Sequence, residues 1–355
     1  MLPKDQKIET PPEIFSHGQK NRWSPVESSI WELKSEASEE DVARSLARTL
    51  FDQPRRIEPR FLYDERGSRL FEKICTLPEY YLTRTEDAIL AKEAEQIIAL
   101  AVVECMVELG AGFSKKTVHL LSQQAKQRGG GTFAPVDVSL TALIGSRDLV
   151  KQQFPQLEFH GLCACYEEGI LSIERSLPTL FAFLGSSVGN LDRSDFDRFF
   201  QLLSGCMGPD DLFLLGVDCT KETELLEKAY NDSEGITAEF ILNAFENINR
   251  VLGSNFDLRK MRYDFCYNLQ WQQMEMYAVS TSDQKIDLPP LESGFLWKEG
   301  EKILVEISRK FEPHQLEQQL EYFGLESIAH CNDPQQWFSL LLFRRCSGCF
   351  QSGQS

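Results

Sequence analysis

The sequence predicts an α/β fold in which a mostly parallel, doubly wound sheet carries helices on both faces, with a second α+β domain beside it. From residue 105 onwards, short apolar runs alternate with helical patterns, as is typical of such a sheet. A glycine turn follows the first apolar run, at the edge where sheets of this kind bind ligands. Between residues 219 and 310 the alternation stops, and we interpret this stretch as an insertion that belongs to the second domain.

Length, composition and charge restrict the classes of protein. The 355 residues suit two domains, and 42% hydrophobic with 26% charged residues is an ordinary globular composition. Lys and Arg number 37 against 54 Asp and Glu, so the net charge of −17 disfavours nucleic acid and anionic lipid as partners. No apolar run reaches the roughly 20 residues that span a bilayer, and the N-terminus lacks the apolar core of a signal peptide. We therefore expect a cytoplasmic protein without nucleic-acid or membrane partners.

The first hundred residues contain an arm and two helix starts. Residues 1–36 hold four prolines and no sustained periodicity, which predicts a loosely ordered arm. Capping-box patterns from Ser38 to Asp41 and from Thr83 to Glu86 each precede apolar residues at helical spacing, so each predicts a helix start. The domain with the parallel sheet is expected over 85–218 and 311–355, and the second domain over 37–84 and 219–310.

Apolar runs of five or six residues predict the strands of the sheet: 105–109, 133–138, 159–164, 180–184 and 212–217. A helix is expected over 114–124, after the first strand. Two further runs, 325–330 and 337–344, are separated by a short polar segment, so we expect an antiparallel pair at the edge of the sheet.

The turn after the first strand is the most informative motif. It reads Val107-Glu-Leu-Gly-Ala-Gly112, and its glycines let the backbone turn tightly beside a ligand. Asp137 ends the next strand, where a carboxylate can accept both hydroxyls of an adenosine ribose. A dinucleotide-binding turn would need a third glycine where Lys115 stands, so the motif favours S-adenosylmethionine, which has no pyrophosphate. A glycine turn without any ligand is the alternative.

Polar residues on two later segments are candidates for a small-molecule site. The segment after residue 184 offers the Gly185 carbonyl and the Asn190 amide at the ligand edge of the sheet. Glu306 and Ser308 share one face of a strand, where a carboxylate beside a hydroxyl would bind an N–H-bearing ring such as imidazole. A solvated strand face is the alternative. Four tyrosines of the second domain look like part of a shaped pocket: Tyr63, Tyr80, Tyr81 and Tyr230.

No metal site is expected from the sequence. Ten cysteines give no disulfide framework at this length. The five histidines are isolated, so the single Cys-x-x-Cys pair, Cys346 and Cys349, has no further zinc ligands and we expect ordinary reduced thiols.

These motifs together resemble the L-histidine Nα-methyltransferases, which make hercynine for ergothioneine biosynthesis. The matching segments run in the same order through residues 60–343: 61–68, 77–84, 107–112, 135–139, 183–190, 215–218, 229–232 and 306–311. The resemblance implies a Rossmann-like class I methyltransferase sheet, a substrate-binding second domain, S-adenosylmethionine as methyl donor without a metal, and L-histidine as substrate. We expect a monomer.

The resemblance also implies the roles of individual residues. The implied cofactor contacts are Glu108, Gly110, Gly112, Lys116, Asp137, Cys165 and Tyr166. The implied substrate contacts are Tyr63, Tyr80, Gly185, Asn190, Tyr230, Met276, Glu306 and Ser308. Asn190 and Tyr230 would hold the histidine carboxylate, with Gly185 near the amine. Glu306 and Ser308 would hold the imidazole, and Asp137 the ribose of the cofactor.

The sequence departs from the family pattern at one place, and two alternative functions stay open. Where the family usually has Asp-Phe beside the adenine, this chain has Cys165-Tyr166, and a thiol is a poor acceptor for the adenine amino group. Another group such as Glu167 would have to substitute. The same fold could methylate a tryptophan or tyrosine derivative, although Glu306 and Ser308 favour histidine over those rings. A catalytically inactive relative that acts as a binding protein is the other alternative.

Overall fold

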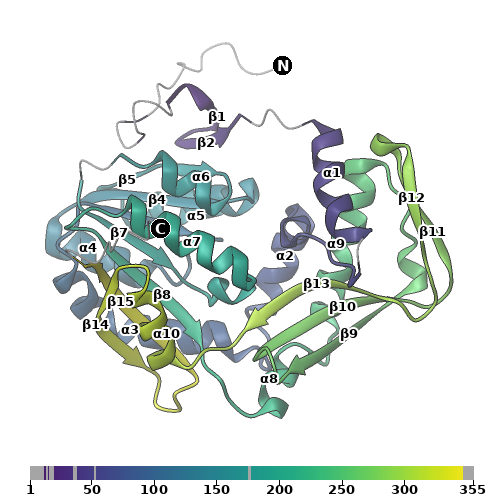
Figure 1. Cartoon of the computed structure of the whole chain (residues 1–355). Helices are drawn as coiled ribbons and strands as arrows, with labels where there is room; N and C mark the ends of the chain where they lie inside the picture. The colour runs from purple at the N-terminus through teal and green to yellow at the C-terminus, as the bar shows by residue number, and fades with distance from the viewer. Residues whose placement is uncertain are drawn as a thin grey trace, which may run out of the picture.

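A computed structural model of the chain describes residues 12, 15, 20–34, 38–51, 53–174 and 177–346. Two bodies lie side by side: a large twisted sheet flanked by helices and, on the right of Figure 1, a smaller unit of helices and strands. The long helix α3 (Tyr81–Leu100) belongs to both, because its first turn packs in the core of the smaller unit and its remainder packs on the sheet.

A ten-stranded sheet forms the centre of the larger body. Its strands lie in the order β1 (Trp23–Glu27), β2 (Ile30–Leu33), β6 (Gly161–Cys163), β4 (Gly131–Asp137), β3 (Cys105–Leu109), β7 (Thr179–Phe183), β8 (Leu212–Asp218), β15 (Phe338–Arg345) and β14 (Leu325–Asn332), and β5 (Leu157–Phe159) pairs with β4. The strands from β2 to β8 are parallel, whereas β1, β15 and β14 pair antiparallel with their neighbours. The order reverses direction between β3 and β7, which is the switch point of the sheet.

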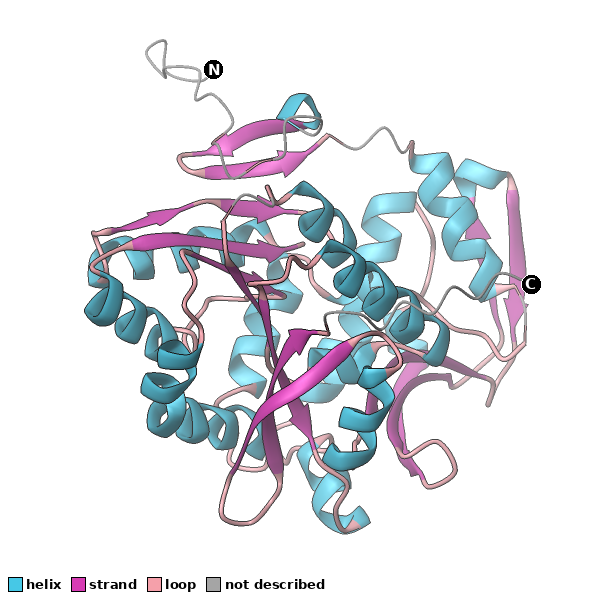
Figure 2. Cartoon of the chain, turned by 60° about the vertical axis from the view of Figure 1, so that its left-hand side comes forward, coloured by secondary structure: helices cyan, strands magenta, loops and turns pink. Residues whose placement is uncertain are grey.

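Helices cover both faces of this sheet, as Figure 2 shows. One apolar layer packs α6 (Tyr166–Ser172), α7 (Arg193–Cys206) and α10 (Pro313–Glu321) against the sheet, and the other packs α3, α4 (Val118–Arg128) and α5 (Leu140–Gln153). The central strands β3, β7 and β8 are buried along their whole length, so their apolar runs are continuous. The predicted α/β fold is therefore confirmed. None of the described helices combines the length and apolarity needed to cross a membrane.

Two details of the predicted sheet domain differ. The strand expected over 159–164 is divided at His160, whose N–H donates to the carbonyl of Phe133 between the separate β5 and β6 pairings with β4. The helix expected over 114–124 begins at Val118, because Ser114 has φ of +53° and the chain makes a turn before the helix.

The expectation of a loosely ordered arm over residues 1–36 is wrong for residues 23–33. Here β1 and β2 form a hairpin, and β2 adds to the central sheet beside β6. The cause is apolar burial, since Trp23, Ile30 and Trp31 are buried. Phe15 stacks on Trp23 with ring centroids 5.1 Å apart. The rest of the predicted arm lies largely outside the described residues.

The smaller unit has one apolar core built from two separate parts of the sequence. The first part holds α1 (Glu39–Leu50), η2 (Pro59–Leu62) and α2 (Glu65–Ile74). The second holds α8 (Thr223–Ala229), α9 (Ile236–Leu252), η4 (Leu258–Lys260), β9 (Met261–Asn268), β10 (Gln273–Ser280), β11 (Gln284–Leu288), η5 (Pro289–Leu291), β12 (Ser293–Trp297) and β13 (Lys302–Arg309). The strands order as β13-β10-β9 with a separate β11-β12 hairpin. We therefore propose that 37–84 and 219–310 be treated as the second domain.

Of the two predicted capping boxes, one is confirmed. Ser38 accepts from the Asp41 backbone N–H, and the Asp41 carboxylate accepts from the Ser38 backbone N–H, at the start of α1. The pattern from Thr83 to Glu86 is not a cap, because α3 already begins at Tyr81 and Glu86 lies buried within the helix.

Truncation of Trp31 tests the hairpin as a part of the fold. Its side chain is 2% exposed, so we expect Trp31→Ala to lower the free energy of unfolding by about 3–5 kcal/mol in a denaturant titration. The matched control is Trp271→Ala, which is 43% exposed and should cost less than about 1 kcal/mol. A loss of unfolding free energy for Trp31→Ala as small as the one expected for the exposed control would show that the hairpin contributes nothing to the folded core.

Candidate functional site

The candidate site lies where the smaller unit meets the switch point of the sheet. After β7, the short helix η3 (Ser187–Asn190) packs against β13 of the smaller unit. Gly189 makes this approach possible, because an added Cβ would lie 2.8 Å from the Arg309 carbonyl oxygen. The Asn190 side chain thereby reaches Glu306 of β13.

The glycine turn after β3 is fastened to Asp137. Gly110 and Gly112 have φ of +67° and +53°, in the left-handed region that glycine tolerates. The Gly112 N–H donates to Asp137 Oδ2 at 2.8 Å, and the Ser139 N–H donates to Oδ1 at 2.8 Å. Burial raises the pKa of Asp137. The Val138 N–H is a third backbone donor to this carboxylate, which has about four lone-pair sites, so room remains for a ligand hydroxyl.

Glu108 supplies an unpartnered polar atom beside this turn. Its Oε1 accepts from the Thr117 hydroxyl at 2.6 Å, and its buried Oε2 has no partner among the described residues. Burial raises the pKa of Glu108 to about 8, only partly offset by the Thr117 hydrogen bond. A buried carboxyl oxygen without a donor fits a ligand that carries an ammonium group, such as the amino-acid end of S-adenosylmethionine.

Glu86 is a functional candidate that the sequence prediction missed. It is fully buried, forms an ion pair with Lys116, and accepts the Gly185 N–H at 2.8 and 2.9 Å. Glu86 therefore fixes the turn after β7, where Gly185 has φ of +73°. A signal existed in the sequence, because Glu86 lies one helical turn before Ile89 and Leu90 on the buried stripe of α3. A charged residue on such a stripe needs a buried partner.

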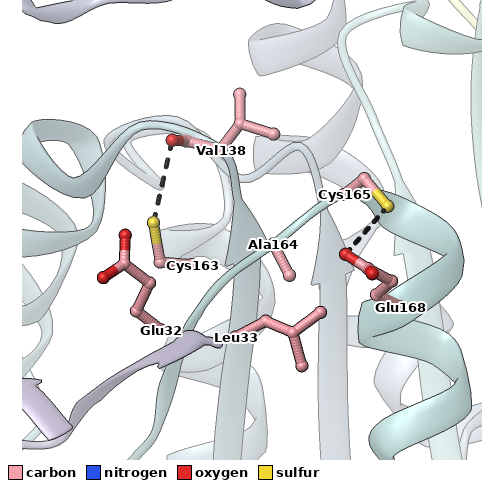
Figure 3. Close-up of a pocket in the computed structure, with 7 residues that line it drawn as sticks. All are labelled: Glu32, Leu33, Val138, Cys163, Ala164, Cys165 and Glu168. Carbon is pink, nitrogen blue, oxygen red and sulfur yellow. Dashed lines mark hydrogen bonds between the residues drawn. The ribbon is translucent and has the colours of Figure 1, made fainter. Parts of the chain in front are cut away.

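A cavity of about 230 Å³ opens beyond Asp137, at the ends of β4 and β6 (Figure 3). Its volume is below the roughly 300–1,000 Å³ of a whole small-molecule site, so it suits one part of a larger ligand. The Cys165 thiol, one of its lining groups, donates to Glu168 Oε2 at 3.3 Å. The full lining is Glu32, Leu33, Val138, Cys163, Ala164, Cys165 and Glu168. Tyr166 lies nearby with its ring 3.3 Å from a Cβ built on Gly110.

Glu306 is the central acidic group on the substrate side. It accepts from the Asn190 amide at 3.1 Å and lies 3.4 Å from the Tyr63 hydroxyl. Met276 is its partner on the neighbouring strand β10. Burial raises the pKa of Glu306 to about 7, with the Tyr63 hydrogen bond and Lys310 opposing the shift.

Ser308, on the same face of β13, belongs to a buried network. It accepts from the Tyr230 hydroxyl and from Lys310 Nζ, each at 2.8 Å. Lys310 also donates to Tyr230 at 2.8 Å and pairs with Asp218 Oδ2 at 2.8 Å, so its three hydrogens are all used. Both lone pairs of Ser308 are thereby occupied. Its own hydrogen has no acceptor among the residues that the structure describes.

The structure brings several of the implied substrate residues together, where they hydrogen-bond to one another. Asn190, expected on the carboxylate, donates to Glu306, expected on the imidazole. Tyr230, the other expected carboxylate anchor, donates to Ser308. Tyr80 packs edge-on against Tyr230 with ring centroids 6.1 Å apart. Sequence reasoning missed the groups behind this cluster, Lys310 and Asp218, because nothing local marks them as partners.

Comparison with known proteins gives a consistent result. Residues 39–345 match the family described as histidine-specific, SAM-dependent methyltransferases. The chain is 33% identical to the histidine N-alpha-methyltransferase of Mycolicibacterium smegmatis, over 87% of this chain and 97% of that protein. The protein of the same name from Mycobacterium tuberculosis is 33% identical over 85% of this chain and 93% of that protein.

Two further matches are more distant. Ergothioneine biosynthesis protein 1 of Neurospora crassa is 31% identical over 78% of this chain and 32% of that protein. Among solved structures, an S-adenosylmethionine-dependent methyltransferase from Clostridium acetobutylicum shares 14% identity over 75% of this chain and 92% of that chain, with a TM-score of 0.42.

The raised pKa of Glu306 predicts a pH-dependent stability of the ligand-free protein. The folded pKa of about 7 lies above the ordinary value of 4.5, so the stabilising contribution is full below pH 4.5 and is lost as the pH rises through 7. Relative to Glu306→Gln, the wild type should lose about 2–3 kcal/mol of unfolding free energy between pH 4.5 and pH 8. Denaturant titrations at both values measure it, and a difference that does not change with pH would contradict the assignment.

Proposed function

The chain belongs to the family of histidine-specific, S-adenosylmethionine-dependent methyltransferases, and we propose that it trimethylates the α-amino group of L-histidine to hercynine, the first step of ergothioneine biosynthesis. The resemblance predicted from the sequence is thus confirmed at the level of the family. The individual residue roles below remain our proposal.

The observation that carries histidine specificity is a donor beside an acceptor on β13. Ser308 has both lone pairs occupied, so it offers a hydrogen, while Glu306 two residues earlier offers carboxylate lone pairs. A neutral imidazole has one N–H and one nitrogen lone pair, and it is complementary to this pair. Indole has an N–H and no ring acceptor, so the Ser308 hydrogen would face no partner. Histidine is therefore favoured over a tryptophan derivative.

We propose that histidine replaces two internal hydrogen bonds. In the ligand-free arrangement the Asn190 amide is held by Glu306, and the Tyr230 hydroxyl is held by Ser308. When histidine binds, both donors would turn to its carboxylate, and Glu306 and Ser308 would turn to its ring. Lys310 keeps donating to Tyr230 and Ser308 throughout. One lone pair of Ser308 is then vacated, and its hydrogen, which has no other acceptor among the described residues, would point to the imidazole nitrogen.

The protein's task in the reaction is alignment of the amine. S-adenosylmethionine, when bound, supplies a methyl group on a positively charged sulfur. The attacking nitrogen must be neutral, since a protonated amine has no lone pair, and fixed carboxylate and ring contacts hold it in line. Burial raises the pKa of Tyr63 and Tyr80 well above their usual range, so both remain hydroxyl donors and do not act as bases. After the third transfer the nitrogen has no proton left to lose.

For the cofactor we propose contacts along the edge of the sheet. Gly110, Gly112, Glu108 and Lys116 would surround its amino-acid end, and Asp137 its ribose. The adenine would occupy the cavity lined by Cys165 (Figure 3). Its amino group would donate to Glu168, not to the expected Glu167. Glu168 is the third residue of α6 and turns back toward the cap residue Cys165, whose thiol holds it.

We further propose that the enzyme acts in the cytoplasm as a monomer that needs no metal for catalysis and binds neither nucleic acid nor membrane. The support is the net charge of −17, which repels polyanionic partners. The sulfonium sulfur would leave as a neutral thioether, so the methyl transfer also needs no Lewis acid.

Mass spectrometry tests the proposed function. Purified protein incubated with S-adenosylmethionine and histidine should add three methyl groups to histidine, and none to tryptophan or tyrosine. Glu306→Ala should raise the KM for histidine by roughly 10- to 150-fold, about 1.5–3 kcal/mol. The control is Glu275→Ala, a buried carboxylate opposite Ile307 on the same three strands. Methylation of another amino acid, or no methylation at all, would contradict the proposal.

Ser308→Ala tests the donor–acceptor argument separately. Loss of one neutral hydrogen bond should raise the KM for histidine about fivefold, or about 1 kcal/mol, and leave the KM for S-adenosylmethionine unchanged. The same variant should narrow the preference for histidine over tryptophan, because the unpaired donor is gone. The preference is measured as the ratio of the dissociation constants for the two amino acids, and an unchanged ratio in Ser308→Ala would remove Ser308 from specificity.

A further inference from the structure

We propose that His314, Glu317 and His330 form a binding site for a divalent transition-metal ion of the zinc type, at the outer edge of the sheet. His314 and Glu317 stand three residues apart on α10, and His330 lies on the edge strand β14. One ligand atom from each of the three lies within 4.8 Å of the others. The sequence suggested no metal site because a helix and a strand bring these residues together across a gap of more than ten positions.

The spacing of the ligand atoms suits a zinc ion. His314 Nδ1 lies 3.0 Å from Glu317 Oε2, and His330 Nδ1 lies 3.5 Å from Glu317 Oε1. Bonds of about 2.0–2.1 Å at tetrahedral angles would put ligand atoms roughly 3.3–3.4 Å apart, which is close to both distances. The two histidines face different oxygens of Glu317, so the carboxylate would bind the ion through both oxygens or turn to offer one. Two imidazoles and one carboxylate favour zinc, cobalt or nickel over magnesium or calcium, which prefer oxygen ligands alone.

Neighbouring polar groups orient two of the three ligands. His330 Nε2 lies 2.8 Å from Asn332 Oδ1, an acceptor that also receives the Ser339 hydroxyl at 2.6 Å. The ring hydrogen therefore belongs on Nε2, which leaves the Nδ1 lone pair facing the Glu317 carboxylate. Two acceptor atoms face each other there unless a proton or a metal cation lies between them. Ser327 donates to Glu317 Oε1 at 2.7 Å and fixes the carboxylate. Such outer partners are characteristic of metal ligands.

The exposure of the cluster leaves a route by which the ion can enter and room for a water as a further ligand. His314 is 86% exposed, whereas the side chains of His330 and Glu317 are 19% and 16% exposed. Three protein ligands with an open side would leave the fourth position to water. The ion would tie α10 to β14. It would lie apart from the proposed substrate site, so we assign it a structural role and not a catalytic one.

Titration of the metal-free full chain with Zn²⁺ and with Co²⁺ tests this site. We expect one ion per chain by calorimetry and the visible absorption of four-coordinate Co²⁺. His314→Ala and Glu317→Gln should each weaken binding at least tenfold, and Asn332→Ala, which removes the outer partner, about tenfold. Because His314 is a surface side chain, its substitution leaves the fold intact and loss of binding reports on the ligand.

Two controls separate this site from other metal-binding groups. His119→Ala removes an imidazole that pairs with Asp87 at 3.0 Å and has no third ligand among the described residues, and it should leave Zn²⁺ binding unchanged. Cys349→Ser removes one thiol of the C-terminal pair, and it should also leave binding unchanged. A sulfur-to-cobalt charge-transfer band, binding retained in both His314→Ala and Glu317→Gln, or no binding by the wild type would each overturn the proposal.

Discussion

The buried ion pair between Asp218 and Lys310 is the interaction on which the site depends. Both side chains are fully buried, and Nζ lies 2.8 Å from Oδ2. Asp218 ends β8 of the large sheet, whereas Lys310 follows β13 of the smaller unit, so the pair joins the two bodies. Tyr81, at the start of α3, donates to both Asp218 oxygens at 2.8 Å, and Lys221 adds a second cation. Removal of one partner from such a pair would leave a buried charge, at a cost of about 3–5 kcal/mol.

The pair also decides how the substrate residues are presented. Because Asp218 holds Lys310, the three Lys310 hydrogens have fixed directions, two of them toward Tyr230 and Ser308. Ser308 is thereby made a donor, while Glu306, on the same strand face, remains an acceptor. On a solvated strand face, neither the Ser308 donor nor the Glu306 acceptor would have a fixed direction. Recognition of a neutral imidazole therefore depends on the charge of Lys310, which does not itself contact the ring.

The parts predicted correctly from the sequence are those with a local pattern. Strand β3 and its glycine turn are specified by five buried residues followed by Gly110 and Gly112, and the structure has β3 at the predicted residues. Several motifs that occur along the chain in the same order as in the methyltransferase family identified the chemistry. The hairpin of β1 and β2 was missed, because its buried tryptophans lie among prolines that suggested an arm. Glu86 was mistaken for a cap residue, because the Thr-x-x-Glu pattern is the same whether the glutamate faces solvent or the core. Lys310 and His330 needed the tertiary fold, since their partners lie on other elements.

Nitrogen NMR of bound histidine, labelled with ¹⁵N in the imidazole, measures the central claim most directly. In a complex with S-adenosylhomocysteine at neutral pH, one ring nitrogen should show the shift of a protonated imidazole nitrogen and the other that of an unprotonated one that accepts a hydrogen bond. Ser308→Ala should move only the unprotonated nitrogen. Two protonated nitrogens, or two averaged signals as in free histidine, would contradict the account, because Lys310 would then not make Ser308 a donor to the ring.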